Sequence, residues 1–209
     1  MTNQHTSFAR AMRTAGVMPA AFALALGLIA FAPGSLRAQA VSDPAQNLAA
    51  QRQAMQALDR MDGVWRGPAW TLRPDGTKHH ITQTERIGPF LAGTLKLIEG
   101  RGYEADGRVS FNAFGVVSYD SRRRAFQMQS HAQGHAGTFV FTPTDDGYAW
   151  SVPAGPDTVM RYTAVIRDDE LVEVGDREAP GRPPERVFEM RLKRLGNTTW
   201  PEAGSVAPR

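Results

Sequence analysis

The stretch MDGVWRGPAW, residues 61–70, holds two tryptophans, two glycines and a proline within ten positions. Gly63 allows the backbone to bend closely, and the flat indole of Trp65 can fill the narrow floor of a barrel. A Gly-x-Trp sequence that opens a strand directly after a helix therefore predicts the first strand of a closed β-barrel. The alternative is a core tryptophan between two turns of a two-sheet sandwich.

Trp65 also predicts a partner near the other end of the chain. In a closed barrel the last strand lies beside the first, and an arginine over an aromatic face stabilises by about 0.5–2 kcal/mol. Arg194 shares its strand face with the apolar residues of the last strand. Arg191 takes this place if a bulge shifts the alternation. We expect Gly63, Trp65 and one of these arginines to close the barrel.

The residues before this stretch predict a helix. The segment 45–61 is rich in alanine and glutamine, which favour helices, and Asp43-Pro44 is a suitable start. Its apolar residues recur near helical spacing, at Leu48, Met55, Leu58 and Met61. We therefore expect a helical region at residues 41–61 in front of a barrel domain at 62–196, with a flexible tail at 197–209.

After the helix, segments rich in Val, Ile, Phe, Tyr and Thr alternate with turns rich in Gly, Asp and Pro. The expected strands lie near residues 63–72, 77–87, 90–103, 109–119, 125–133, 137–143, 147–152, 158–167, 170–177 and 185–195. Short connections make neighbouring strands antiparallel. About ten strands in one small domain leave long edges unless the sheet closes, so we expect an all-β, antiparallel up-and-down barrel.

The chain resembles a family of exported bacterial lipocalin-like barrels, and more distantly nitrobindin and the fatty-acid-binding proteins, all of the calycin type. The matching stretches are DGVWRG, TQTERIGPFLAGTLKLIEGRGY, FNAFGVVSYD, DGYAWSVPAGP, MRYTAVI and FEMRLKR, which span nearly all of residues 62–195. The resemblance implies a ligand-binding barrel. It implies no particular activity, because that family has none assigned to transfer.

The first forty residues predict a secretory signal peptide. Arg10 and Arg13 precede an apolar run from Val17 to Phe31, and Ala38-Gln39-Ala40 matches the signal-peptidase pattern. An uncleaved anchor is the alternative, but the run is short for a bilayer, which needs about 20 residues. We expect Sec-type export, cleavage after Ala40, a periplasmic or secreted protein and no stable membrane insertion of the mature chain.

Removal of this leader changes the charge balance. The chain has 24 Lys and Arg against 21 Asp and Glu, and three of the arginines lie in the leader, so 21 of each sign remain. A neutral mature chain gives no reason to expect a nucleic-acid partner. The chain has no cysteine, which excludes disulfides, a thiol nucleophile and a cysteine metal site. The oligomeric state stays open.

Two strands carry charged residues on faces that also carry apolar ones. Glu85 follows Ile81 and Gln83 on one face, and Glu99 and Arg101 continue the face of Leu95 and Leu97. Buried charges are costly unless they are paired. If these faces point inward, they anchor a partly apolar small molecule; otherwise the strand ends leave the core at the barrel mouth. The candidate ligand-binding residues are Glu85, Glu99, Arg101, Met128, Trp150, Arg161 and Tyr162.

We expect a non-enzymatic binding protein. An alternative is an enzyme in which Glu85 or Glu99 acts as general acid or base and Tyr162 or Arg161 binds the substrate. This pairing requires both carboxylates to face one interior. A third interpretation places the function on the outer surface of the barrel, which an exposed apolar patch would favour.

The histidines do not predict a metal or cofactor site. Nitrobindin takes its haem ligand from the late part of the barrel, whereas this chain has no histidine after His135. His79 and His80 are adjacent, so they point to opposite faces of a strand. His131 and His135 flank a turn without a nearby carboxylate, which is a poor set for zinc. We therefore expect no metal ion and no cofactor.

Overall fold

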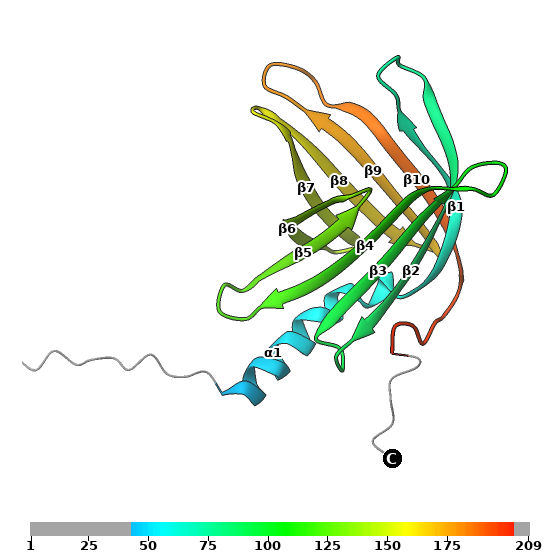
Figure 1. The fold of residues 1–209 in the computed structure, drawn as a ribbon. Coiled ribbons are helices and arrows are strands. Elements are labelled where there is room, and N and C mark those ends of the chain that lie inside the picture. The colour runs from blue at the N-terminus through cyan, green and yellow to red at the C-terminus, as the bar shows by residue number, and fades with distance from the viewer. Residues whose placement is uncertain (1–42, 203–209) are drawn as a thin grey trace, which may run out of the picture. The chain divides into compact units, whose positions relative to one another are not determined.

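The computed structural model describes residues 43–202, and these form one closed β-barrel with a helical segment at one end (Figure 1). The expected signal peptide at 1–40 and the last residues of the expected tail, 203–209, lie outside the described residues. Within the described part of the chain, no helix is long and apolar enough to span a membrane.

A helix, α1 (Pro44–Met55), is followed directly by a 3₁₀ turn, η1 (Gln56–Met61), and then by ten strands. The strands are β1 (Gly63–Leu72), β2 (Lys78–Phe90), β3 (Leu95–Tyr103), β4 (Val109–Asp120), β5 (Ala125–Ala132), β6 (His135–Thr144), β7 (Gly147–Gly155), β8 (Thr158–Arg167), β9 (Glu170–Glu178) and β10 (Glu185–Gly196).

Each strand pairs antiparallel with its neighbours in sequence, and β1 also pairs with β10, which closes the sheet. Trp65 lies opposite Arg194 on one side and opposite Glu85 on the other. The prediction of an all-β, up-and-down barrel preceded by a helix is confirmed, and the sandwich alternative is excluded because no second sheet exists among the described residues.

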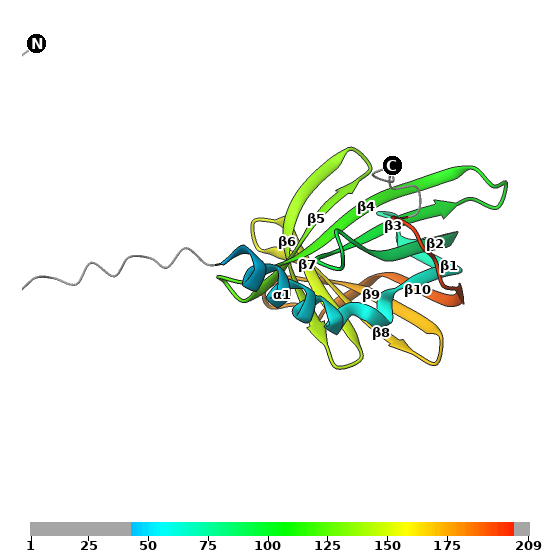
Figure 2. The same cartoon turned by 90° about the horizontal axis from the view of Figure 1, so that it is seen from below.

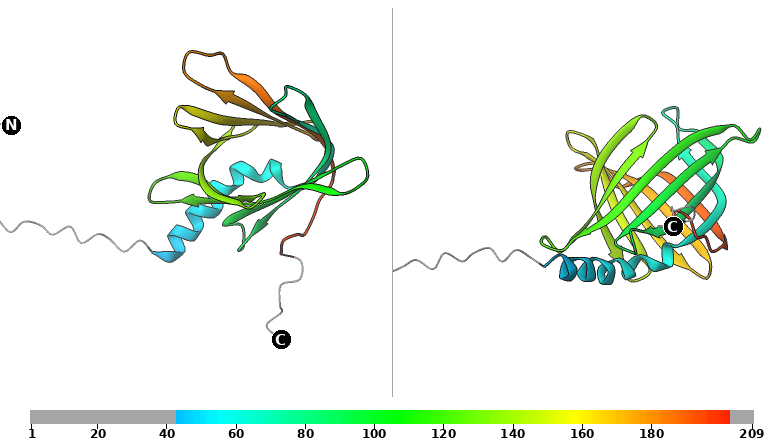
Figure 3. Two further views of the ribbon diagram at one scale, coloured as in Figure 1. Left: turned by 45° about the horizontal axis from the view of Figure 1, so that its top comes forward. Right: turned by 60° about the horizontal axis from the view of Figure 1, so that its bottom comes forward.

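The helical segment covers the end of the barrel where β1 begins (Figures 2 and 3). Asp43 caps α1 by accepting a hydrogen bond from the backbone N–H of Ala45 at 3.0 Å. Two side chains of α1 donate hydrogen bonds to backbone carbonyls of the barrel, Gln51 to that of Tyr119 near the end of β4 at 3.3 Å and Arg52 to that of Ala92 in the β2–β3 turn at 3.0 Å. Apolar side chains project into the core from this segment, namely Met55, Leu58 and Met61.

Trp65 lies at this closed end with 1% of its surface exposed. Its indole N–H donates to the carbonyl of Met61 at 2.9 Å. The guanidinium of Arg194 lies 5.7 Å from the ring centroid and donates to the carbonyl of Asp62 at 2.6 Å. Arg191 instead points away from the interior and pairs with Glu170 at 2.8 Å. Of the two candidate arginines, only Arg194 therefore touches the tryptophan.

Gly63 is required at the start of β1 for two reasons. Its φ of +146° is one that other residues rarely adopt, and a Cβ there would lie 3.0 Å from Nε of Arg194. The glycine therefore lets the arginine side chain cross the strand and reach the ring of Trp65.

The opposite end is formed by five hairpin turns, and one pair of strands separates toward it. β6 and β7 pair only over four positions, from Thr144 opposite Gly147 to Phe141 opposite Trp150. Residues 135–140 of β6 and residues 151–155 of β7, which form the outer parts of these strands, are not paired with one another. Pro153 lies in this part of β7, where a missing N–H costs no ladder bond to β6.

Two details of the chain path differ from the sequence expectation. The turn expected at Gly88-Pro89 falls later, because β2 continues to Phe90 and the chain reverses through Leu91 to Thr94. Trp200, in the segment expected to be a flexible tail, lies against the barrel: the Arg86 guanidinium is 4.5 Å from its ring centroid.

Candidate functional site

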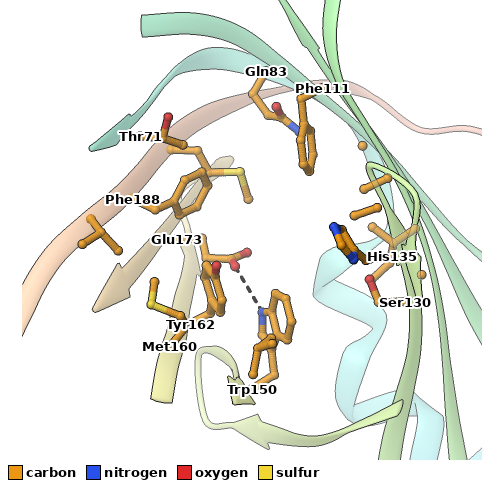
Figure 4. Close-up of a pocket in the computed structure, with 18 of the residues that line it drawn as sticks. Thr71, Gln83, Phe111, Ser130, His135, Trp150, Met160, Tyr162, Glu173 and Phe188 are labelled. Atoms are coloured by element: carbon orange, nitrogen blue, oxygen red, sulfur yellow. Dashed lines mark hydrogen bonds between the residues drawn. The ribbon is translucent and has the colours of Figure 1, made fainter. Parts of the chain in front are cut away.

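The barrel encloses a cavity of about 1210 Å³ that opens among the hairpins opposite the helical end. Its wall comes from the inward-facing residues of all ten strands. The aromatic residues of this wall include Phe111, Phe139, Phe141, Tyr148, Trp150, Tyr162 and Phe188. Figure 4 shows several of them facing one another across the interior.

On β2, β3 and β4, small residues leave the space open. Gly100 on β3 is the cross-strand neighbour of Glu85 on β2. A Cβ at Gly100 would come within 2.8 Å of Oε1 of the Glu85 carboxyl. A Cβ at Gly102 would lie 2.6 Å from Cδ1 of Ile81. These glycines therefore give room to longer side chains of β2 that lie over the β3 backbone and line the cavity.

The facing wall, from β6 to β10, is aromatic. Trp150 and Tyr162 stack with ring centroids 4.3 Å apart and planes inclined by 13°. Phe139 packs against Trp150 at 5.8 Å, and Phe188 packs edge-on against Tyr162 at 5.9 Å. Such contacts hold the rings in fixed positions and present their faces and edges to any molecule inside.

Glu173, on β9, projects into the cavity beside this aromatic wall (Figure 4). Only 6% of its surface is exposed. Its carboxyl accepts hydrogen bonds from the hydroxyl of Tyr148 at 2.6 Å and from the indole N–H of Trp150 at 3.2 Å. Burial raises the pKa of Glu173 although both hydrogen bonds act to lower it. Burial and the nearby charge of Glu173 also raise the pKa of Tyr162.

Glu85, on β2, is the second carboxyl in the cavity, with 8% of its surface exposed. It accepts one hydrogen bond, from the side-chain amide of Gln83 at 2.7 Å, and no other is found among the described residues. Burial, together with the charges of Glu173 and Glu99, raises the pKa of Glu85 to about 8, although the hydrogen bond from Gln83 acts to lower it. At neutral pH this carboxyl is therefore mostly protonated.

No cation lies beside these two acids in the described part of the chain. Lys96 is buried, with 1% of its surface exposed, but its ammonium group pairs with Asp62 and Asp59 at the closed end. The basic residues that line the cavity belong to its rim, where Arg177 pairs with Glu185 at 2.7 Å. The deep part of the cavity is thus apolar, aromatic and acidic.

The structure brings together four of the seven ligand-binding candidates. Glu85, Met128, Trp150 and Tyr162 line the cavity. The other three lie on the outer face of the sheet, in ion pairs: Glu99 with Arg86 and Arg101, and Arg161 with Glu178.

The pairing of Glu85 with Glu99, which the alternative enzyme interpretation requires, does not occur. Glu85 lies opposite Gly100 and Glu99 lies opposite Arg86, so the two carboxyls occupy opposite faces of the sheet. The inward residues of β3 are Ile98, Gly100 and Gly102, not the face of Leu97 and Glu99. An acid–base enzyme that uses both glutamates on one small substrate is therefore ruled out by their placement.

Sequence reasoning missed Glu173, Gln83 and Tyr148. In β9, the apolar pair Val172 and Val174 indicates an inward face, yet Leu171, Glu173 and Gly175 are the residues that point inward. The available sequence signal was the alternation that places Glu173 on the same strand face as the apolar residue Leu171, which is fully buried.

The histidines are dispersed. His79 pairs with Glu104 at 3.0 Å near the rim, and His135 lines the cavity from β6. Among residues 43–202, no group of three His, Asp or Glu side chains is arranged to hold a metal ion.

Comparison with known proteins supports the fold alone. No family model matches the chain, and no curated protein matches it. Among solved structures, the crystal structure of Rv2717c from M. tuberculosis is similar, with a TM-score of 0.51 and 16% sequence identity over 68% of this chain and 96% of that one. At this level of identity, the chain and that protein share a barrel architecture.

Proposed function

We propose that this protein is an exported, periplasmic or secreted binding protein whose barrel holds a small, partly apolar molecule. The observation that carries this proposal is the cavity of about 1210 Å³, lined by aromatic and aliphatic side chains and open at the hairpin end. Pockets for small molecules have volumes of roughly 300–1,000 Å³, with apolar walls and a few placed polar groups. This cavity is somewhat larger than that range, and its largely apolar wall with two buried carboxyl groups meets the second condition.

The leader supports the cellular part of the proposal. Its basic start, apolar run and Ala38-Gln39-Ala40 sequence are those of an export signal. Amino-terminal sequencing of protein recovered from the periplasm or medium tests the expected cleavage after Ala40.

Binding is tested by titrating the purified protein with the uncharged fluorescent probe N-phenyl-1-naphthylamine. We expect a saturable rise in fluorescence with one site per chain. Trp150→Ala should weaken probe binding strongly while leaving a cooperative thermal transition, because Trp150 faces the cavity. Trp70→Ala is the matched control, since Trp70 lies on the outer side of β1 under the ammonium group of Lys78 at 3.6 Å. A linear, unsaturable response in folded protein would refute the proposal.

A further inference from the structure

The two acids in the cavity lack a positive partner. Glu173 and Glu85 are both buried, they interact electrostatically, and the only buried ammonium group of the described chain, that of Lys96, is engaged elsewhere. A carboxyl group in such a place is costly unless a charge or hydrogen bonds compensate it. Something outside the protein can therefore complete this site.

We propose that the occupant of the cavity is an organic amine: a protonated nitrogen held by Glu173 and Glu85, attached to an apolar or aromatic body that fills the rest of the space. This inference rests on the proposed function and specifies its ligand class. Two independent features support it, namely the acids and the rings around them.

The rings are arranged as a cation requires. Glu173 is held between the hydroxyl of Tyr148 and the indole N–H of Trp150, which stacks on Tyr162. A cation near Glu173 therefore lies close to several aromatic rings, and contact with a ring face stabilises a cation more strongly where water is excluded. The same donors keep the carboxyl in one orientation before the ligand arrives, which reduces the entropy lost on binding.

The placement of the two acids favours a ligand-binding role over a structural one. The second oxygen of Glu85 has no hydrogen-bond partner among residues 43–202, and the carboxyl lies over Gly100, where any larger residue would displace it. An anionic ligand would meet two acids and no deep cation. A neutral ligand could hydrogen-bond to the protonated acids but would not be attracted by the carboxylates that form when they ionise.

The rim does not oppose a cationic ligand. Its arginine on β9, Arg177, is paired with Glu185, and His79 is paired with Glu104. These ion pairs reduce the positive field that a cation meets on entry. The remaining rim cation, Arg73, lies in the turn between β1 and β2, away from the cavity floor.

Binding of an amine should release a proton. The groups near Glu85 are Gln83 on its own strand, Glu173 on β9, Tyr148 on β7 and, through the sheet, Glu99 on β3. The reaction is the protonated amine plus the protonated Glu85 carboxyl, giving the ion pair and one free proton. Affinity for the amine should therefore rise as pH increases from about 6 to 8, while affinity for a neutral analogue should not.

The test compares three probes of similar shape by isothermal titration calorimetry. They are the cation of 1-naphthylmethylamine, the neutral alcohol 1-naphthalenemethanol and the anion of 1-naphthylacetic acid. At pH 7.5 we expect the amine to bind at least about tenfold more tightly than the alcohol, the difference typical of one charge-assisted interaction, and the acetate to bind most weakly. Glu173→Gln and Glu85→Gln should each remove most of the amine preference. Glu170→Gln, on the outer side of β9, should leave it unchanged.

The alcohol distinguishes the two levels of the proposal. If the alcohol binds but the amine binds no better, the amine inference is wrong and the binding function stands. If neither the alcohol nor the amine binds to protein with a cooperative thermal transition, both are wrong. Binding of the alcohol by each glutamine variant shows that the variant has kept its cavity, so loss of amine preference is then due to the missing charge.

Discussion

At the scale of single residues, the molecule treats its buried charges in two ways. Lys96, at the closed end, is surrounded by acids and serves the structure. Glu85 and Glu173, in the cavity, are held by neutral donors and leave their charge uncompensated. Because an uncompensated carboxyl costs stability when it ionises, the residues that define the cavity also make the free protein less stable as it loses protons.

Trp65 should contribute to stability and not to selectivity. Replacing it with alanine removes a fully buried indole and its hydrogen bond to Met61, so we expect a loss of about 3–5 kcal/mol in the free energy of unfolding. Urea denaturation measures this loss. Trp70→Ala, at the outer side of the same strand, should cost far less. Equal losses for the two variants would show that Trp65 does not close the barrel.

Glu85 should make stability fall as pH rises. Below pH 4.5 the carboxyl is protonated in both states; between 4.5 and about 8 only the folded state keeps the proton. The unfolded state then binds fewer protons, so the free energy of unfolding decreases by of order 1 kcal/mol per pH unit in this window. In Glu85→Gln this decrease should become smaller, because only the part due to Glu173, whose pKa burial also raises, remains. Urea denaturation between pH 5 and 8 measures the difference.

Glu170 offers the opposite sign as a control. Its hydrogen bonds and charge interactions with Lys193 and Arg191 lower its pKa, so its stabilising effect is present above its ordinary pKa and is lost in acid. Glu170→Gln should therefore alter stability only toward the alkaline side of that transition and leave the slope between pH 5 and 8 as in the wild type. If Glu85→Gln also leaves that slope unchanged, the carboxyl is not buried as described.

At the scale of elements, most of the fold is predictable because strands and turns are encoded locally. Glycine, aspartate and proline mark the reversals, and Gly63–Leu72 and Thr158–Arg167 form strands at their expected positions. The inward face is harder to predict. On β3 that face includes Gly100 and Gly102, which carry no side chain, so hydrophobic alternation cannot detect it. Leu97, on the other face, is buried because it lies opposite Gly88, against which the backbone of Trp200 packs.

The site was less predictable for a related reason. The aromatic residues Trp150 and Tyr162 follow the alternation of their strands, so the sequence identifies them as cavity residues. Glu173 does not, because an acid between two valines has the pattern of an exposed residue. The pairing of β7, β8 and β9 places Tyr148 and Glu173 on either side of the small Ala164, and the hydrogen bonds from Tyr148 and Trp150 then make an inward glutamate tolerable.

The helical segment should act as the floor of the barrel. Leu58, in η1, is fully buried, whereas Leu48, in α1, is exposed. Leu58→Ala should therefore lower the free energy of unfolding by about 2–5 kcal/mol, and Leu48→Ala should change it little. Denaturant melts of both variants check this. A large effect of Leu48→Ala would mean that the outer side of α1 is covered in solution.

At the scale of the whole molecule, closure removes the sheet edges that an open ten-stranded sheet would expose. The first and last strands are paired along most of their length, from Trp65 opposite Arg194 to Thr71 opposite Phe188. The weakest connection lies instead in the middle of the chain, between β6 and β7. The barrel is thus stable at the join of its termini and open along an internal boundary.

Hydrogen exchange should reveal this distribution. We expect amides of β1 and β10 to exchange as slowly as those of β8 and β9, because all four strands are paired on both sides. In the outer parts of β6 and β7, at 135–140 and 151–155, about every second amide faces no strand and should exchange much faster. Rapid exchange along β1 or β10 would instead indicate that the barrel opens at its termini.

The short β6–β7 ladder also gives the barrel a mechanical property. A complete cylinder of hydrogen bonds resists widening, whereas this one is slit along its outer half, and the slit ends at Phe141 and Trp150, which both line the cavity. The outer parts of β6 and β7 can bend outward without breaking hydrogen bonds between these two strands, so we expect the wall to flex there more than at the end covered by the helical segment. For the ligand proposed above, we expect the upper size limit to depend on the stiffness of these two strand ends as well as on the diameter of the mouth.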